Sequence, residues 1–234
     1  NKNIFIHIGL GKTSTTTLQK KIFPELSKDI NYEFIDKNSL FNLIKKSSNL
    51  TNNINNIVDF RSNYLNNNLK INKINLNNAI VSFEGLAGYL YNINLYEKMM
   101  YFTRELFGSE SKIIITIREP LDYLNSEYIM AHRMTGITEN EFILNNCEYT
   151  FPLLTNGVSK NPWTKDNISY LNLINLYKKN FNDVFILKYE NIKQFLFIKE
   201  IFNLDNLEKY KHIYSVNRLN VSYGKYHINF LNIL

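Results

Sequence analysis

The chain has 234 residues and a net charge of +6, and 44% of its residues are hydrophobic and 21% charged. This composition is typical of a soluble globular protein and excludes collagen-like, disulfide-scaffold and fully disordered proteins. No apolar run approaches the roughly 20 residues that a membrane-spanning helix needs. Cys147 is the single cysteine, so a disulfide framework and a cysteine-based metal site are excluded. We expect one domain over residues 1–234, a cytoplasmic location and no metal.

The excess of positive charge favours an acidic partner, such as a nucleotide, a nucleic acid, an anionic glycan or a membrane surface. The lysine pairs at 20–21, 45–46 and 178–179 are scattered along the chain and form no basic tail. We therefore interpret them as solvated surface and expect no nucleic-acid partner.

The chain opens with a pattern typical of a strand, a polar turn and a helix. Residues 4–8 form a short, nearly continuous apolar run that stops at a glycine, as expected of a strand buried on both faces of a parallel sheet. Residues 9–17 are rich in glycine and hydroxyl side chains. Leu18, Ile22 and Leu26 then recur at helical spacing, which predicts a helix after the turn.

Further strands and helices alternate along the chain. We predict strands over 32–35, 79–83, 112–117 and 183–187, and helices over 95–107, 120–135, 168–181 and 195–204. Two more helices are predicted within an Asn-rich excursion at 38–78, one around Leu40, Phe41 and Ile44 and one around Ile57, Phe60 and Tyr64. Gly108 fits a helix C-cap, Pro120 fits a first helical turn, and Gly136 is expected to end that helix. Residues 145–162 and the tail after 204 are expected to be irregular.

Strands that alternate with helices predict βαβ units and an α/β fold with a mostly parallel central sheet. Ligands of such sheets bind beyond the carboxyl ends of the strands. The segments that follow the predicted strands are residues 9–17, Glu84, Arg118 and residues 188–190. We therefore expect the chemistry of this protein at that edge of the sheet.

Residues 9–17, Gly-Leu-Gly-Lys-Thr-Ser-Thr-Thr-Thr, have the composition of an anion-binding loop. Backbone N–H groups at the start of a helix favour a phosphate or a sulfate. Lys12 adds a positive charge, and the hydroxyl groups of residues 13–17 add donors. The pattern is not a Walker A loop, because Ile6 stands where that motif needs its first glycine. The alternative is a Thr-rich helix cap with an exposed lysine.

A second anion site is predicted where the strand at 112–117 ends. Arg118 offers a planar guanidinium that suits phosphate oxygens. Ser126, about two turns along the following helix, can add a hydroxyl donor to the same group. The alternative is a surface ion pair between Arg118 and Glu119 or another carboxylate.

The two segments together resemble the PAPS-dependent sulfotransferases, whose donor is 3′-phosphoadenosine 5′-phosphosulfate (PAPS). His-Ile-Gly-Leu-Gly-Lys-Thr-Ser-Thr-Thr-Thr-Leu-Gln at 7–19 is similar to their 5′-phosphosulfate loop, most closely to the bacterial form H-I-G-x-x-K-T-G-T-T-S-L-Q. Arg118, Pro120 and Ser126 match the spacing of their 3′-phosphate motif. The resemblance implies a P-loop-like, sulfotransferase-like fold with three layers. The donor-binding residues that it implies are Gly11, Lys12, Thr13, Ser14, Thr15, Thr16, Thr17, Arg118 and Ser126.

Ser14 is a departure from that family, which usually has glycine at this position. Glycine adopts positive φ without steric cost. If Ser14 has a negative φ, we expect a normal loop; if its φ is positive, we expect a strained loop or a weaker donor site.

Glu84 follows a buried strand and is expected to face the same crevice as Lys12. Sulfuryl transfer to an alcohol needs a base for the hydroxyl proton. The resemblance to the glycan-modifying branch of the family implies that Glu84 is this base, and His132 is its rival. Alternatively, Glu84 caps a helix or pairs with Lys12. His7 lies within the first strand and is expected to be a core histidine.

Two later segments agree with the resemblance. Residues 185–192, which include Tyr189 and Glu190, are similar to the family's later strand and Y-E-x-[LI] turn. In the tail, Arg218, Gly224 and Lys225 are candidates for a late loop over the 3′-phosphate of the donor.

The resemblance implies an enzyme, a sulfotransferase that moves the sulfuryl group of PAPS in line to a hydroxyl and releases adenosine 3′,5′-bisphosphate. It needs no metal, and its expected acceptor is a carbohydrate such as a glycan or glycoconjugate. Lys12 would be catalytic, because it offsets charge on the bridging oxygen. One alternative is a P-loop nucleoside or small-molecule kinase, which needs ATP, Mg²⁺ and a Walker B-type aspartate. The other is an inactive protein of the same fold that binds a nucleotide or a glycan.

Overall fold

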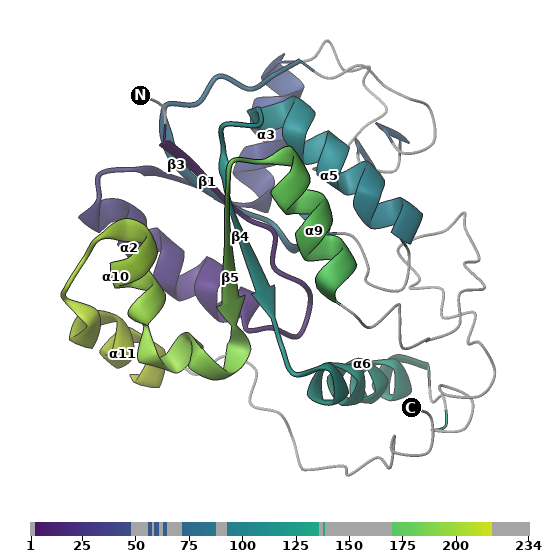
Figure 1. Cartoon of the computed structure of the whole chain (residues 1–234), viewed down its shortest axis with the longest axis vertical. Coiled ribbons are helices and arrows are strands. Elements are labelled where there is room, and N and C mark those ends of the chain that lie inside the picture. Colours follow the sequence, from purple (N-terminus) through teal and green to yellow (C-terminus); the bar gives the residue numbers. More distant parts are fainter. Residues whose placement is uncertain are drawn as a thin grey trace.

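A computed structural model describes residues 3–47, 56–57, 59–60, 63–64, 72–87, 93–135, 138 and 170–216. Its centre is a five-stranded sheet with the order β2-β3-β1-β4-β5, in which every pair of neighbours is parallel (Figure 1). The strands are β1 (Asn3–His7), β2 (Glu33–Ile35), β3 (Asn78–Ser82), β4 (Lys112–Ile117) and β5 (Asp183–Lys188). The predicted α/β fold with a parallel sheet is therefore confirmed.

The central strand β1 is buried on both of its faces. Ile4 and Ile6 belong to the apolar cluster on one side of the sheet, and Phe5, between them, belongs to the cluster on the other side. This alternation follows from the two-residue period of a strand. It explains why the strand reads as a continuous apolar run rather than as an alternation with polar residues.

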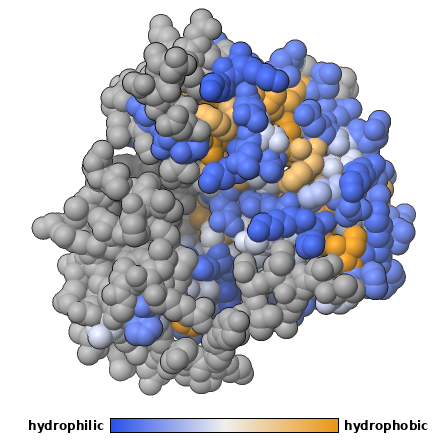
Figure 2. Space-filling model, turned by 180° about the vertical axis from the view of Figure 1, so that it is seen from behind, coloured by the Kyte–Doolittle hydropathy of each residue, from blue (hydrophilic) through white to orange (hydrophobic). Residues whose placement is uncertain are grey.

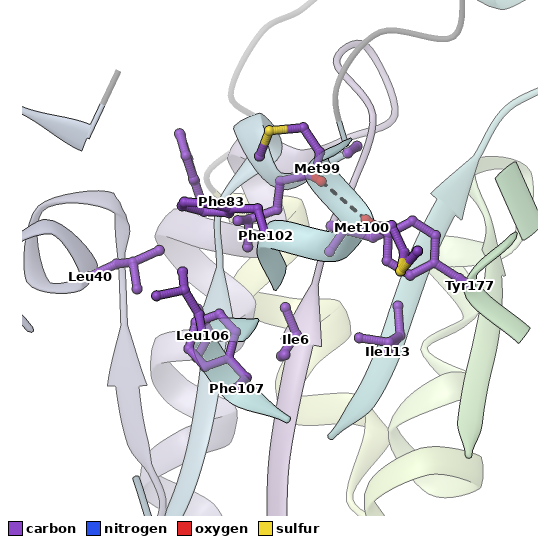
Figure 3. Packing of buried hydrophobic residues seen from close by; sticks show 14 of the residues in the cluster. Ile6, Leu40, Phe83, Met99, Met100, Phe102, Leu106, Phe107, Ile113 and Tyr177 are labelled. Carbon is purple, nitrogen blue, oxygen red and sulfur yellow. Dashed lines mark hydrogen bonds between the residues drawn. The ribbon is translucent and has the colours of Figure 1, made fainter. Parts of the chain in front are cut away.

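Helices cover both faces of the sheet (Figure 1). One face carries α3 (Lys37–Ser47), α5 (Ile93–Phe107) and α9 (Tyr170–Asn180), and the other carries α2 (Phe23–Asp29), α10 (Leu196–Phe202) and α11 (Leu207–Val216). In Figure 3, Phe102 of α5 and Tyr177 of α9 lie over Ile6 of β1 and Ile113 of β4. α6 (Pro120–Thr135) lies beyond the carboxyl end of β4 rather than against either face.

The first helical segment is interrupted by a π turn that the sequence pattern did not predict. α1 (Thr15–Thr17) leads directly into the π turn η1 (Leu18–Ile22) and then into α2. Pro24, in the first turn of α2, has no N–H to donate to the carbonyl four residues earlier. The wider turn before Pro24 accommodates this missing hydrogen bond. The apolar residues still form one buried stripe, as predicted: Leu18, Ile22 and Leu26.

The other predicted elements are found within a few residues of their expected bounds. Gly108 ends α5 with φ 90° and donates its N–H to the carbonyl of Arg104, which is the expected C-cap. Within the excursion, Ile57, Phe60 and Tyr64 are helical. Gly136, the predicted loop at 145–162 and the end of the tail lie outside the described residues.

The prediction of an irregular tail after residue 204 is wrong for α11. This helix places Tyr210 against Phe195, with ring centroids 6.4 Å apart, and Tyr210 Oη donates to Asp29 at 2.5 Å. Leu207, Tyr210 and Ile213 share a helical spacing of three residues, and all three pack in the second apolar cluster. The polar residues between them hid this short stripe in the sequence.

The described surface is mainly hydrophilic on the side that Figure 2 shows. The large apolar side chains that the described residues expose are Tyr101, Leu171 and Leu196, on three different helices. Among the described residues, no helix has both the length and the apolar character to span a bilayer.

Candidate functional site

Three neighbouring strands end beside one another and bring the expected functional groups to one edge of the sheet. β1 lies between β3 and β4, and all three run in the same direction. The loop at 8–14 follows β1, Glu84 begins the short 3₁₀ helix η2 (Glu84–Leu86) after β3, and Arg118 directly follows β4. Hydrogen bonds join Glu84 and Arg118 to the residues that follow β1.

A chain of hydrogen bonds connects the buried end of the sheet to the loop. Thr13 Oγ1 donates to the carbonyl of Leu10 at 2.6 Å and lies 2.8 Å from Thr116 Oγ1. Since the single hydroxyl proton of Thr13 is used for Leu10, Thr116 must donate to Thr13. His7 Nε2, 3.3 Å from Thr116 Oγ1, then donates to Thr116, and Ser82 Oγ donates to His7 Nδ1 at 2.6 Å.

The hydrogen bond between Ser82 and His7 Nδ1 has this direction because His7 is neutral. The ring of His7 is fully buried, and burial lowers its pKa to about 3. Both ring nitrogens have partners, so His7 is the core histidine that the sequence predicted. Through Thr116, His7 is connected by hydrogen bonds to Thr13 of the loop.

The turn after β1 has room only for glycine at position 9. A Cβ atom there would lie 2.5 Å from Thr116 Oγ1 and 2.6 Å from His7 Nε2, and it would also clash with the methyl group of Thr15. Because Gly9 has no Cβ, the loop can pass directly beside the side chains of His7 and Thr116.

Lys12 and Ser14 both adopt left-handed backbone conformations, with φ 63° and φ 62°. A residue with a Cβ pays about 1–2 kcal/mol for this conformation. The helix starts directly after Ser14, whose carbonyl accepts hydrogen bonds from the N–H groups of Thr17 and Leu18 at 3.0 and 3.1 Å. The first N–H groups of this helix have no acceptor within it. The loop therefore has the form of an anion site, and Ser14 carries the strain expected for a positive φ.

Glu84 is held beside the start of this helix. The hydroxyl of Thr15 donates a hydrogen bond to Glu84 Oε1. Glu84 is half-buried, whereas Thr15 is buried. The contact fixes the carboxylate between the loop after β1 and the end of β3, on the same edge of the sheet as Lys12.

Arg118 reaches back across the loop. Its Nη1 donates to the carbonyl of Lys12 at 3.2 Å, and its Nη2 lies 4.0 Å from the exposed carboxylate of Asp122. Arg118 Nε is buried and has no acceptor among the described residues. A guanidinium has five N–H donors. Within the described part of the chain, the one hydrogen bond that they make is from Nη1 to the carbonyl of Lys12. Arg118 therefore keeps most of its capacity to bind an anion.

The turn after β5 supports Arg118 from the far side. The ring of Tyr189 lies under the guanidinium, with the Cζ atom of Arg118 4.5 Å from the ring centroid. Glu190 accepts a hydrogen bond from the backbone N–H of Glu119 at 2.9 Å. These residues begin the 3₁₀ helix η3 (Tyr189–Gln194). The Tyr-Glu pair that the sequence singled out thus contacts the predicted arginine site directly.

The remaining two candidates lie on α6. Ser126 is half-buried about two turns after Arg118, and no hydrogen bond joins the two side chains within the described residues. His132 is exposed, and its ring lies 5.8 Å from that of Tyr128. Of the two candidate bases, Glu84 is the more buried and the one that contacts the loop.

Glu127 is a candidate site residue that the sequence did not predict. It directly follows Ser126 and is only 8% exposed. Burial and the negative charge of Glu84 raise its pKa to about 7, although the positive charge of Lys12 opposes that shift. A single glutamate on a helix gives no sequence signal of burial. Its place next to Ser126, a predicted site residue, was the only hint in the sequence.

Arg218, Gly224 and Lys225 lie outside the described residues. Within the described residues, no cluster of three or more His, Cys, Asp or Glu side chains could hold a metal ion. The amino-acid sequence matches no protein-family model and no curated protein.

Proposed function

We propose that this protein is a PAPS-dependent sulfotransferase with a P-loop-like, sulfotransferase-like fold. The observation that carries the proposal is the contact between the two predicted anion sites. Arg118 Nη1 donates a hydrogen bond to the carbonyl of Lys12, so the loop after β1 and the arginine after β4 are in direct contact. A nucleotide with phosphate groups on both its 3′ and 5′ oxygens is the type of ligand that needs two such sites side by side.

The chemistry of the donors fits such a nucleotide. The N–H groups and hydroxyls of residues 13–17 and the Lys12 ammonium would bind the 5′-phosphosulfate. Arg118, with its unused donors, and Ser126 would bind the 3′-phosphate. The alternative role of Arg118 is a surface ion pair. The carboxylate of Asp122 is exposed and lies 4.0 Å from Arg118 Nη2, so this ion pair is a weak contact.

The proposed reaction is an in-line transfer. The acceptor hydroxyl oxygen forms a bond to sulfur, the bond between sulfur and the bridging oxygen breaks, and the bridging oxygen leaves with the 5′-phosphate. Glu84 takes the hydroxyl proton, and its hydrogen bond from Thr15 keeps the carboxylate directed at the loop. Lys12 offsets the charge that grows on the leaving oxygen. The acceptor would be a carbohydrate hydroxyl.

One observation favours a second candidate function, nucleotide binding without turnover. Ser14 has φ 62°, where the family that the loop resembles usually has glycine. The added Cβ strains the loop. A protein of this kind would bind adenosine 3′,5′-bisphosphate but transfer no sulfuryl group to any acceptor.

The test is a calorimetric titration with adenosine 3′,5′-bisphosphate and, separately, with ATP and Mg²⁺. The proposal expects the bisphosphate to bind and Lys12→Ala to weaken that binding at least tenfold, as loss of a charge-assisted contact does. Lys20→Ala removes an equal charge from an exposed position and is the matched control. Binding of ATP with Mg²⁺ but not of the bisphosphate would overturn the proposal and support the kinase. Bisphosphate binding without turnover of PAPS on a panel of glycans would support the second candidate.

A further inference from the structure

The carboxylate of Glu127 lies beside Gly11 in the proposed anion-binding loop. Glu127 Oε1 lies 3.7 Å from the position that a Cβ on Gly11 would occupy. Glu127 is only 8% exposed. Burial makes an ionised carboxylate energetically costly, so the surroundings of Glu127 favour the protonated form.

Two charged groups from other elements act on Glu127. Lys12, in the loop after β1, favours the ionised form, and Glu84, in η2 after β3, disfavours it. Arg118, at the end of β4, is directed at the Lys12 carbonyl and the ring of Tyr189. On α6 itself, Asp122 and His132 are both exposed. Burial exceeds the effect of Lys12, and the pKa of Glu127 is raised to about 7.

We propose that Glu127 is a proton-linked member of the donor site, which takes up one proton when the 5′-phosphate of the nucleotide binds to the loop at 11–17. This inference rests on the proposed function. A phosphate bound to this loop brings negative charge next to a carboxylate that faces the same backbone. Repulsion between the two disfavours the ionised form of Glu127 further, so nucleotide binding and protonation favour each other.

The protonated form has two effects on the site. It removes one negative charge that would oppose the phosphate, and it converts an acceptor-only group into one with an O–H donor. Lys12 is then no longer partly neutralised by a buried neighbour and can interact fully with the ligand. The buried carboxyl group thus makes the affinity of the loop for a phosphate depend on pH near neutrality.

The test measures binding of adenosine 3′,5′-bisphosphate by calorimetry between about pH 6 and pH 8.5, in pairs of buffers with different heats of ionisation. For the wild-type protein we expect uptake of close to one proton above pH 7. The affinity should fall as pH rises, by up to about tenfold per unit. Glu127→Gln, a neutral mimic of the same shape, should bind at least as tightly at high pH and should lose this part of the proton uptake. Glu200→Gln, at an exposed position on α10, is the matched control.

The phosphate groups of the ligand titrate in the same range, but equally for wild type and Glu127→Gln, so the difference between them isolates Glu127. Equal proton uptake by both proteins overturns this inference and leaves the proposed function intact. Absence of bisphosphate binding at every pH overturns the proposed function instead. If Glu127→Gln does not fold, the wild-type protein still decides: no proton uptake beyond that of the ligand's own phosphates contradicts the inference.

Discussion

The guanidinium of Arg118 donates a hydrogen bond from Nη1 to the backbone carbonyl of Lys12 across 3.2 Å. The two residues are far apart in the sequence and are brought together because β1 and β4 are neighbours in the sheet. The contact has a consequence for the loop, since the accepting carbonyl belongs to a residue with φ 63°. Arg118 therefore helps to hold Lys12 in a backbone conformation that its side chain disfavours.

Replacing Arg118 should weaken binding of adenosine 3′,5′-bisphosphate much more than binding of adenosine 5′-phosphate. Arg118→Ala removes charge-assisted contacts with the 3′-phosphate, worth about 1.5–3 kcal/mol, or about 10- to 150-fold in affinity. Adenosine 5′-phosphate lacks that group and should lose only the smaller effect on the loop. Calorimetric titration with both ligands measures the difference.

The control is Arg104→Ala, which removes an arginine that hydrogen-bonds Asn180 at the far end of α5. It should leave both affinities unchanged. An equal loss for the two ligands in Arg118→Ala would show that Arg118 acts only on the loop and does not recognise a 3′-phosphate.

Tyr189 is expected to position the guanidinium of Arg118 for the same ligand group. Tyr189→Leu keeps an apolar side chain but removes the cation–π contact, worth about 0.5–2 kcal/mol. We expect a loss of about 2- to 30-fold in bisphosphate affinity and little change for adenosine 5′-phosphate, measured as the ratio of the two dissociation constants. Tyr101→Leu, on the exposed surface of α5, is the matched control. An unchanged ratio in Tyr189→Leu would mean that the ring only fills space.

The sequence predicted the strands and most helices because their signals are local. A strand such as β4 is recognised from its own apolar run at residues 113–115. A helix end is recognised from a single residue, such as Gly108 or Pro120. α11 was missed because its burial depends on Phe195 and Asp29, which lie on other elements. Pairs of polar residues separate the apolar ones in its own sequence.

The placement of the candidate site residues could also be predicted from the sequence. Lys12, Glu84 and Arg118 lie at one edge of the sheet because each follows a strand of a parallel sheet, and chain topology alone brings such positions together. Glu127 was not found, because its burial depends on how α6 packs against the loop and on the backbone at Gly11. A position in the middle of a helix carries no mark of that packing.

Ser14→Gly should stabilise the protein. The left-handed conformation at φ 62° costs a serine about 1–2 kcal/mol. Part of this gain is lost to the greater freedom of glycine in the unfolded chain. We expect a net increase of about 0.5–1 kcal/mol in the free energy of unfolding, measured by urea denaturation. The bisphosphate should also bind more tightly if strain limits the loop.

Asn31→Gly is the matched control, since Asn31 has φ 55° but asparagine tolerates this region better than serine. Asn31→Gly should therefore raise the free energy of unfolding by less than Ser14→Gly does. A loss of stability in Ser14→Gly would show that contacts of the serine side chain outweigh the backbone strain.

His7 should make the protein less stable in mild acid. Its pKa is about 3 in the folded protein and about 6.5 in the unfolded chain, so the unfolded chain binds more protons between these values. The contribution of His7 is fully present above pH 6.5 and is lost as pH falls, by up to about 1.4 kcal/mol per unit. Glu127 acts in the opposite sense, because its raised pKa favours the folded state as pH falls below 7.

Urea denaturation of wild type and His7→Gln between about pH 5 and pH 7.5 separates the two contributions. His7→Gln should be less stable than wild type at pH 7.5, because it disturbs the hydrogen bonds to Ser82 and Thr116. Its free energy of unfolding should nevertheless fall less steeply towards pH 5, since glutamine does not titrate. Parallel pH profiles for wild type and His7→Gln would contradict a neutral, buried His7 and the direction of hydrogen bonds that follows from it.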